Sequence, residues 1–159
     1  MKTLELIPGT GLGSLQFGMS MAEVEQILGG AQKSYTEEDG QYTYKVLDYP
    51  EQGISMFFRE SYGFRFSSIE VNITKQSIRL FGESLASKSR DQVVEILRNN
   101  LPEDEIREIQ ESRLKSLGQH TLWVPSLGAM FYFDRAGLLQ ELQGSPLLDP
   151  EGQFLWPES

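Results

Sequence analysis

The sequence predicts an α+β protein made of two tandem halves, each a helix followed by an antiparallel sheet, with the helices packed on one face of the sheet. Two observations predict it: two capped helical segments recur along the chain, and two similar hairpins follow them in the same order. We place the first helix-sheet half at residues 1–82 and the second at residues 83–159. A single compact unit with a shared core is the alternative.

The two helical segments begin with the same capping pattern. Residues 20–28 and 89–97 each open with a serine that stands three residues before a glutamate or glutamine. This capping box satisfies backbone amides at a helix start. Apolar residues at i, i+3 and i+4 then predict one buried stripe on each helix, formed by Val24, Ile27 and Leu28 in the first and by Val93, Ile96 and Leu97 in the second.

The two hairpins share a Pro-x-x-Gly turn. It lies between β-rich runs in residues 50–58 and again in residues 125–133. Proline sets φ at the start of such a turn, and glycine accepts a positive φ at its end. Strand alternation places one set of apolar side chains on the core face, namely Met56, Phe58, Phe131 and Phe133.

Two further segments complete the predicted elements. The apolar alternation after Gly63 changes parity at Ser67–Ser68, which predicts a β-bulge there. Residues 103–117 follow Pro102 and fit either a helix or a strand, and both remain open.

The opening of the first helix carries a resemblance. The run Phe17-Gly18-Met19-Ser20, with Val24 and Leu28-Gly29 behind it, resembles the start of the BamE/SmpA family of small outer-membrane assembly lipoproteins. β-Lactamase inhibitor proteins share that family's fold, as two helix-plus-sheet repeats. The resemblance implies a fold whose open sheet face binds other proteins. It implies neither family's function, because this chain has no cysteine for a lipid or a disulfide.

Composition narrows the classes of function. The net charge of −9 and the pI near 4.6 disfavour binding to nucleic acid and suit a basic partner. Without cysteine there is no thiol nucleophile and no thiolate metal site. We expect no signal peptide at the N-terminus and no membrane span, and therefore a cytoplasmic protein.

No motif for catalysis, metal or cofactor stands out. His120 is the only histidine, and we assign it a structural or surface role. The glycine-rich residues 9–13 predict a turn leading into a short strand rather than a phosphate loop. The acidic clusters at 37–39 and 103–105 predict solvated or helix-start charge. We expect no cofactor, no metal site and no enzyme activity.

The aromatic residues predict a binding face. Phe57 and Tyr132 alternate with core residues and are expected on the opposite, open side of the sheet. With Arg59 and Trp123 they would form an aromatic patch that anchors a partner. The alternative is that loops or the segment Phe154-Leu155-Trp156 cover this patch.

The leading hypothesis is a cytoplasmic protein-binding module of the inhibitor or immunity type. It would bind another protein, such as a basic secreted nuclease toxin, through the open sheet face. The alternatives are a small-ligand-binding protein or enzyme with a pocket between helices and sheet, and a structural homo-oligomer whose open faces pair with one another.

Overall fold

The computed structural model describes residues 2–114 and 119–157. The largest sheet has eight strands in the order β10-β11-β12-β13-β7-β6-β5-β4. Its strands are β4 (Lys33–Glu38), β5 (Thr43–Tyr49), β6 (Ile54–Arg59), β7 (Arg65–Asn72), β10 (Gln110–Leu114), β11 (Gln119–Val124), β12 (Ala129–Phe133) and β13 (Leu139–Gly144). Every neighbouring pair in this sheet is antiparallel.

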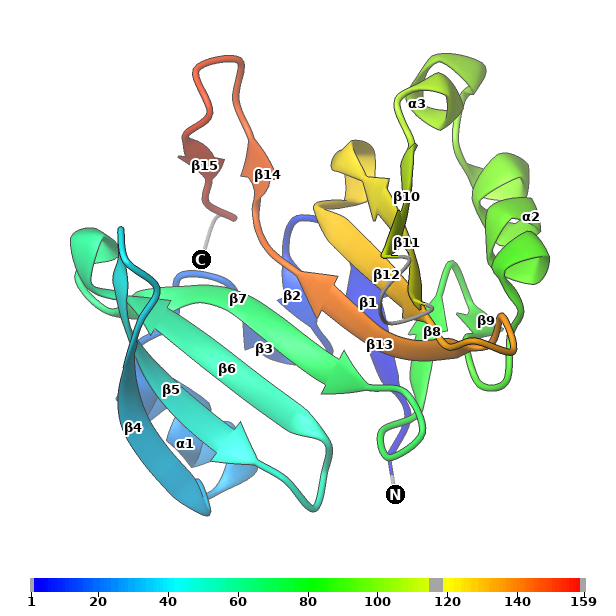
Figure 1. The fold of residues 1–159 in the computed structure, drawn as a ribbon. Coiled ribbons are helices and arrows are strands. Elements are labelled where there is room, and N and C mark those ends of the chain that lie inside the picture. The colour runs from blue at the N-terminus through cyan, green and yellow to red at the C-terminus, as the bar shows by residue number, and fades with distance from the viewer. Residues whose placement is uncertain (1, 115–118, 158–159) are drawn as a thin grey trace.

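A second sheet of five strands lies behind the first in Figure 1, in the order β3-β2-β1-β8-β9. It consists of β1 (Leu4–Ile7), β2 (Gly11–Leu12), β3 (Leu15–Gln16), β8 (Ile78–Leu80) and β9 (Glu83–Ser84). Strand β1 pairs with β8 in parallel, so the start of the chain lies beside its middle. Near the C-terminus, β14 (Leu147–Leu148) and β15 (Phe154–Leu155) form a small hairpin.

The helices are few and short among the described residues. They are α1 (Met21–Leu28), α2 (Arg90–Asn100) and α3 (Glu103–Arg107), with 3-10 turns η1 (Glu60–Tyr62) and η2 (Pro125–Leu127). Figure 1 shows α1 behind β5 and α2 beside the β10 edge of the large sheet.

The predicted fold class of two helix-plus-sheet halves is wrong. The protein is mostly β-sheet, and β7 pairs directly with β13, so strands from both halves share one continuous sheet. The layer opposite that sheet is largely the five-stranded sheet rather than helices. Strands β2, β3 and β9 are too short to show an alternating pattern of apolar and polar residues. The parallel pairing of β1 with β8 joins segments that are distant in the sequence, so no local pattern predicts it.

One core fills the space between these layers. The buried cluster runs from Leu6 in β1 to Leu142 in β13 and includes residues of both sheets, α1 and α2. The predicted core positions of one methionine and three phenylalanines are confirmed, because Met56, Phe58, Phe131 and Phe133 are each 0% exposed. Burying such side chains is the main favourable contribution to folding.

Several local predictions are confirmed. Both capping boxes form, with Ser20 and Glu23 at α1 and Ser89 and Gln92 at α2. Both Pro-x-x-Gly turns close through an amide of the glycine that donates to the proline carbonyl. Residues 9–13 form a turn into short strands, as predicted.

The predicted bulge is confirmed at Ser67. Phe57 lies opposite Ser68 and Phe58 lies opposite Phe66, so Ser67 is the extra residue in β7. Its Oγ donates to the Phe57 carbonyl (3.0 Å) and accepts from the Arg59 amide (3.2 Å). The bulge keeps apolar residues on the core side both before and after it.

Two predictions are corrected or resolved at the helices. Ile27 was expected in the buried stripe of α1 but is 42% exposed. The side of this eight-residue helix that faces the core is narrow, and Val24 is its one buried residue. Residues 103–117 were left open between helix and strand, and both occur, as α3 and then β10. Residues 115–117 of that segment lie outside the described residues.

We predict that Gly11→Ala strongly destabilises the protein. Gly11 has a φ of 155°, and a Cβ there would lie 1.9 Å from the carbonyl oxygen of Leu15 across the β2–β3 pair. We expect a loss of about 2–4 kcal/mol in the free energy of unfolding, measured by urea denaturation followed through tryptophan fluorescence. Gly30→Ala is the matched control, because a Cβ there meets nothing within 4 Å. Equal midpoints for the two variants would contradict the expectation.

Candidate functional site

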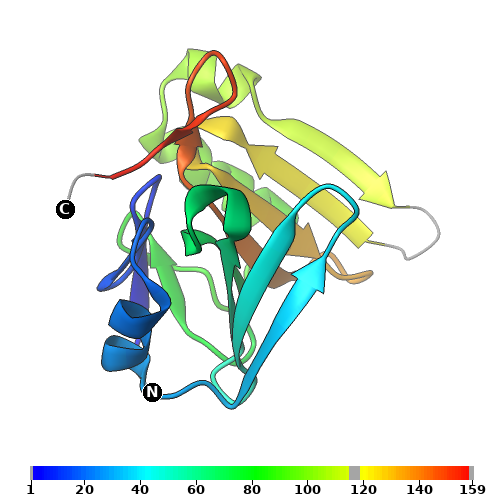
Figure 2. The same ribbon diagram turned by 90° about the vertical axis from the view of Figure 1, so that its left-hand side faces the viewer.

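The face of the eight-stranded sheet that points away from the core is the candidate site, and we call it the outer face. Figure 1 looks onto it, and no described element lies across β6, β7 or β13 in this view. Figure 2 shows α1 and the five-stranded sheet together on the opposite side. Side chains on the outer face alternate along each strand with the buried ones.

The strand register aligns one residue from each of the eight strands into a row across the outer face. Each member lies directly opposite the next across a strand pair. In order from β10 to β4 the row is Gln110, Trp123, Met130, Gln143, Glu70, Ser55, Asp48 and Lys33. The row is apolar on the β11–β12 side and acidic from its middle towards β5.

Glu70 and Gln143 meet at the middle of this row, where β7 pairs with β13. The Gln143 side-chain amide donates to Glu70 Oε1 (3.2 Å) and to Glu141 Oε2 (3.3 Å). The Tyr132 hydroxyl donates to Gln143 Oε1 (3.2 Å). One glutamine thus bridges two carboxylates and one phenol that come from three strands.

Glu70 is the electrostatically unusual group of the outer face. Burial, together with the nearby charges of Glu141, Glu37 and Asp48, raises its pKa to about 7. Its side chain accepts a hydrogen bond from the neutral amide of Gln143, and no lysine or arginine of the described residues forms an ion pair with it. The carboxylate is therefore half-buried without a counter-charge.

A hollow of about 300 Å³ opens beside Glu70, and we call it the Glu70 hollow. The rings of Tyr44 and Phe57 meet edge to face within it, 6.1 Å between centroids. Its full lining is Glu37, Asp39, Tyr44, Phe57, Ser68, Ile69, Glu70 and Gln143. The hollow thus combines two aromatic rings with three carboxylates.

A second hollow, of about 430 Å³, lies on the other side of Glu141. It is lined by Asn72, Tyr132, Phe133, Asp134, Arg135, Gln140 and Glu141. The outer face is therefore uneven, with a depression on each side of the polar bridge at Gln143. Such relief gives a partner's side chains places to insert.

The structure places three of the predicted site residues, Phe57, Trp123 and Tyr132, half-buried on the outer face. They do not form one continuous patch. Phe57 lies with Tyr44 on the β5–β6 side, whereas Trp123 and Tyr132 lie with Met130 on the β11–β12 side. Strands β7 and β13, with Glu70, Glu141 and Gln143, separate the two aromatic groups.

Arg59, the fourth predicted residue, is held by tyrosines. Its guanidinium carbon lies 3.2 Å from the ring centroid of Tyr42 and 4.7 Å from that of Tyr62. Cation–π stacking of this kind fixes an arginine in place. Arg59 thus lies at the edge of the candidate site, where it joins the end of β6 to the chain before β5 and to η1.

The C-terminal segment packs at this same edge. Phe154 and Trp156 contact the Tyr62 ring at 5.1 and 5.3 Å between centroids, and the Arg65 guanidinium lies 4.0 Å from the Trp156 ring. None of these described ring contacts reaches Phe57 or Tyr132. The segment borders the outer face instead of covering its centre.

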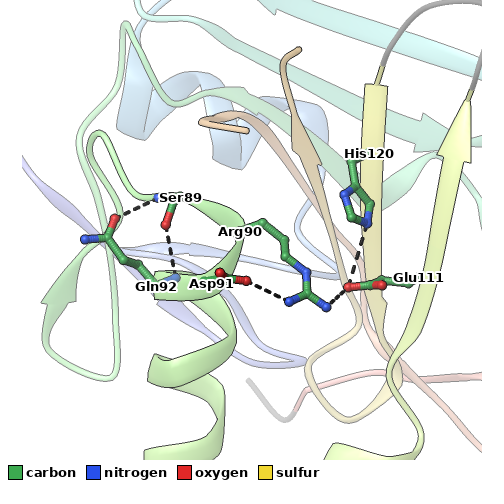
Figure 3. Close-up of polar contacts among 6 residues, drawn as sticks. All are labelled: Ser89, Arg90, Asp91, Gln92, Glu111 and His120. Atoms are coloured by element: carbon green, nitrogen blue, oxygen red, sulfur yellow. Dashed lines mark hydrogen bonds and ion pairs between the residues drawn. The ribbon is translucent and has the colours of Figure 1, made fainter. Parts of the chain in front are cut away.

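His120 belongs to a polar cluster on the core side of the sheet, shown in Figure 3. Its Nε2 lies 3.7 Å from Glu111 Oε1, and the same oxygen pairs with Arg90 at the start of α2. Burial lowers the pKa of His120, and the charges of Arg113 and Arg90 lower it further. The cluster ties α2 to β10 and contains no nucleophile next to the histidine.

Sequence reasoning missed the polar centre of the site. Glu70, Glu141 and Gln143 alternate with buried residues, so the alternation and the Ser67 bulge together predict that their side chains lie on the outer face. Their proximity depends on the β7–β13 pairing, which no local pattern shows. Residues 37–39 were predicted to carry only solvated charge; Glu37 lies on β4, and Glu37 and Asp39 line the Glu70 hollow.

The comparisons with known proteins add no relative. No family model matches the chain, no curated protein matches it, and no solved structure matches its fold. The resemblance to the BamE/SmpA family therefore stays a prediction.

Metal-binding clusters and membrane-spanning helices are both absent from the part of the chain that the structure describes. Nowhere in residues 2–114 and 119–157 do three or more histidine, aspartate or glutamate side chains gather in a way that could hold a metal ion. Among the same residues, no helix has the length and apolar character needed to cross a membrane.

We predict that Glu70→Gln changes how stability depends on pH. The folded pKa of Glu70 lies above its unfolded value, so the folded state binds the extra proton between about pH 4.5 and 7. Stability from this group is therefore present below pH 4.5 and declines as pH rises through 7. Relative to wild type, Glu70→Gln should gain about 1 kcal/mol at alkaline pH, after allowance for solvent screening, and almost nothing in acid.

Urea denaturation across this pH range measures the effect. Glu38→Gln is the control, because Glu38 is exposed on the same sheet and does not line the Glu70 hollow. A constant difference between Glu70→Gln and wild type at all pH values would contradict the assignment.

Proposed function

We propose that this protein is a binding module of the inhibitor or immunity type, and that its outer face docks a basic partner protein. The observation that carries the proposal is the layout of that face: an acidic centre at Glu70 and Glu141 with an aromatic group on each side. Interfaces of this kind bury aromatic anchors and use charge for orientation and specificity.

Charge selects the chemistry of the partner. The chain carries a net charge of −9, and the outer face adds Glu37, Asp48, Glu70 and Glu141 to one surface. Complementary potentials accelerate encounter and disfavour partners of like charge. A basic protein, such as a nuclease toxin that must be neutralised in the cell that makes it, fits this surface.

Shape and side-chain type support the same proposal. Phe57, Trp123 and Tyr132 are half-buried, and aromatic side chains have few rotatable bonds, so they should lose little conformational entropy in a complex. The polar bridge at Gln143 between them is already hydrogen-bonded. A binding role needs these properties, and it needs no nucleophile or metal.

Photo-crosslinking locates the interface and identifies the partner. A benzophenone amino acid at Ser55, on the outer face, should capture a basic protein from the native lysate, whereas the same group at Glu95 on α2 should not. The captured protein is then purified and its affinity for the whole chain is measured by calorimetry. Equal capture from both positions, or capture of acidic proteins alone, would contradict the proposal.

We predict that Phe57→Ala/Tyr132→Ala weakens binding of this partner by at least about thirtyfold, because each truncated anchor costs 1 kcal/mol or more. The matched control is Ile7→Ala/Ile27→Ala, which removes two apolar side chains, 41% and 42% exposed, from β1 and α1 on the opposite side of the sheet. It should leave affinity unchanged. Circular dichroism checks that both variants are folded. Equal affinity of the two double variants would place the interface elsewhere.

A further inference from the structure

The Glu70 hollow has a chemical character that the proposed function does not specify. The edge-to-face rings of Tyr44 and Phe57 supply aromatic surface, and Ser68 and Gln143 add neutral polar groups. Carboxylates come from three different segments: Glu37 on β4, Asp39 after it, and Glu70 on β7. A cavity with aromatic surface and carboxylates is suited to an organic cation, because both features attract positive charge.

We propose that the Glu70 hollow binds the cationic end of one lysine or arginine side chain from the partner, which pairs with Glu70 and rests on the rings of Tyr44 and Phe57. This inference rests on the proposed function, since it names the contact through which the outer face recognises a basic protein. In this proposal one basic side chain of the partner inserts beside Glu70, in addition to the general attraction between the acidic face and a basic protein.

No lysine or arginine is among the described residues that line the Glu70 hollow, and three cations of nearby strands are held elsewhere or point away from it. The Arg59 guanidinium stacks on Tyr42 and Tyr62. Lys45 belongs to the other side of β5, where its ammonium lies 4.5 Å from the Phe64 ring. Lys33 lies at the far end of the cross-strand row and does not line the hollow. The described chain thus leaves this charge for another molecule to neutralise.

The state of Glu70 makes such binding sensitive to pH. Burial raises its pKa to about 7, together with the acidic groups that face it, which are Glu141 on β13, Glu37 on β4 and Asp48 on β5. A bound cation favours the ionised carboxylate. Affinity should therefore rise with pH from about 6 to 8, a range in which lysine and arginine side chains keep their charge.

Small probes test the hollow without the partner. The ¹⁵N-labelled whole chain is titrated with N-acetyl-lysine methylamide and N-acetyl-arginine methylamide, and amide shifts are followed by NMR. The neutral controls of matched shape are the norleucine and citrulline analogues. We expect millimolar binding of a charged probe, with shifts centred on Phe57, Ser68 and Glu70, and about tenfold tighter binding at pH 8 than at pH 6.

Variants of the acidic residues test whether the charged probe pairs with Glu70. Glu70→Gln should weaken the charged probe and remove the pH dependence, whereas Glu38→Gln, at an exposed position of β4 that does not line the hollow, should keep both. Glu37→Gln, at an exposed position of the same strand, serves as a second test outside the core. It should weaken binding without removing the pH dependence.

Three results would overturn the inference: equal shifts from the neutral analogues, shifts centred away from the hollow, or no change of affinity with pH in wild type. They would leave the docking proposal standing, because that proposal is tested with the partner and with Phe57 and Tyr132 together. Conversely, a charged probe in the hollow combined with a partner that crosslinks elsewhere would contradict the docking proposal alone. The two failures are therefore distinguishable.

Discussion

The antiparallel pairing of β7 with β13 is the constraint on which the rest of the structure depends. It joins four strands from each side of the chain into one sheet, so neither group ends in an exposed edge at the centre of the molecule. The same pairing sets Ile69, Val71 and Leu142 against one core. Because residues opposite each other share a face, it also places Glu70 beside Gln143 on the other side.

The Ser67 bulge makes that pairing compatible with the rest of β7. In a regular strand Phe66 and Ile69, three residues apart, would point to opposite faces, and one of them would leave the core. The Ser67 hydroxyl pairs with the Phe57 carbonyl and the Arg59 amide, two backbone groups beside the point where the ladder is irregular. The bulge at Ser67 thus lets Phe66 and Ile69 both face the core while Ser68 and Glu70 lie on the outer face.

The outer face combines features that oppose stability but favour recognition. Glu70 is half-buried among carboxylates without a cation, which costs free energy in the isolated chain. Phe57, Trp123 and Tyr132 keep apolar surface in water. A partner that brings positive charge to the centre and apolar surface to the flanks relieves both costs at once. The polar cluster at His120, in contrast, already contains its own charge partners.

The sequence by itself determined the local features of this protein. Serine caps, Pro-x-x-Gly turns, the bulge at Ser67 and the sides of the strands on which Met56 and Phe57 lie all follow from interactions within a few residues. The five-stranded sheet, the single eight-stranded sheet and the polar centre of the site follow instead from the packing of the whole chain. Each of these depends on pairing between distant strands, whose register is set by packing of the whole core and not by any local pattern.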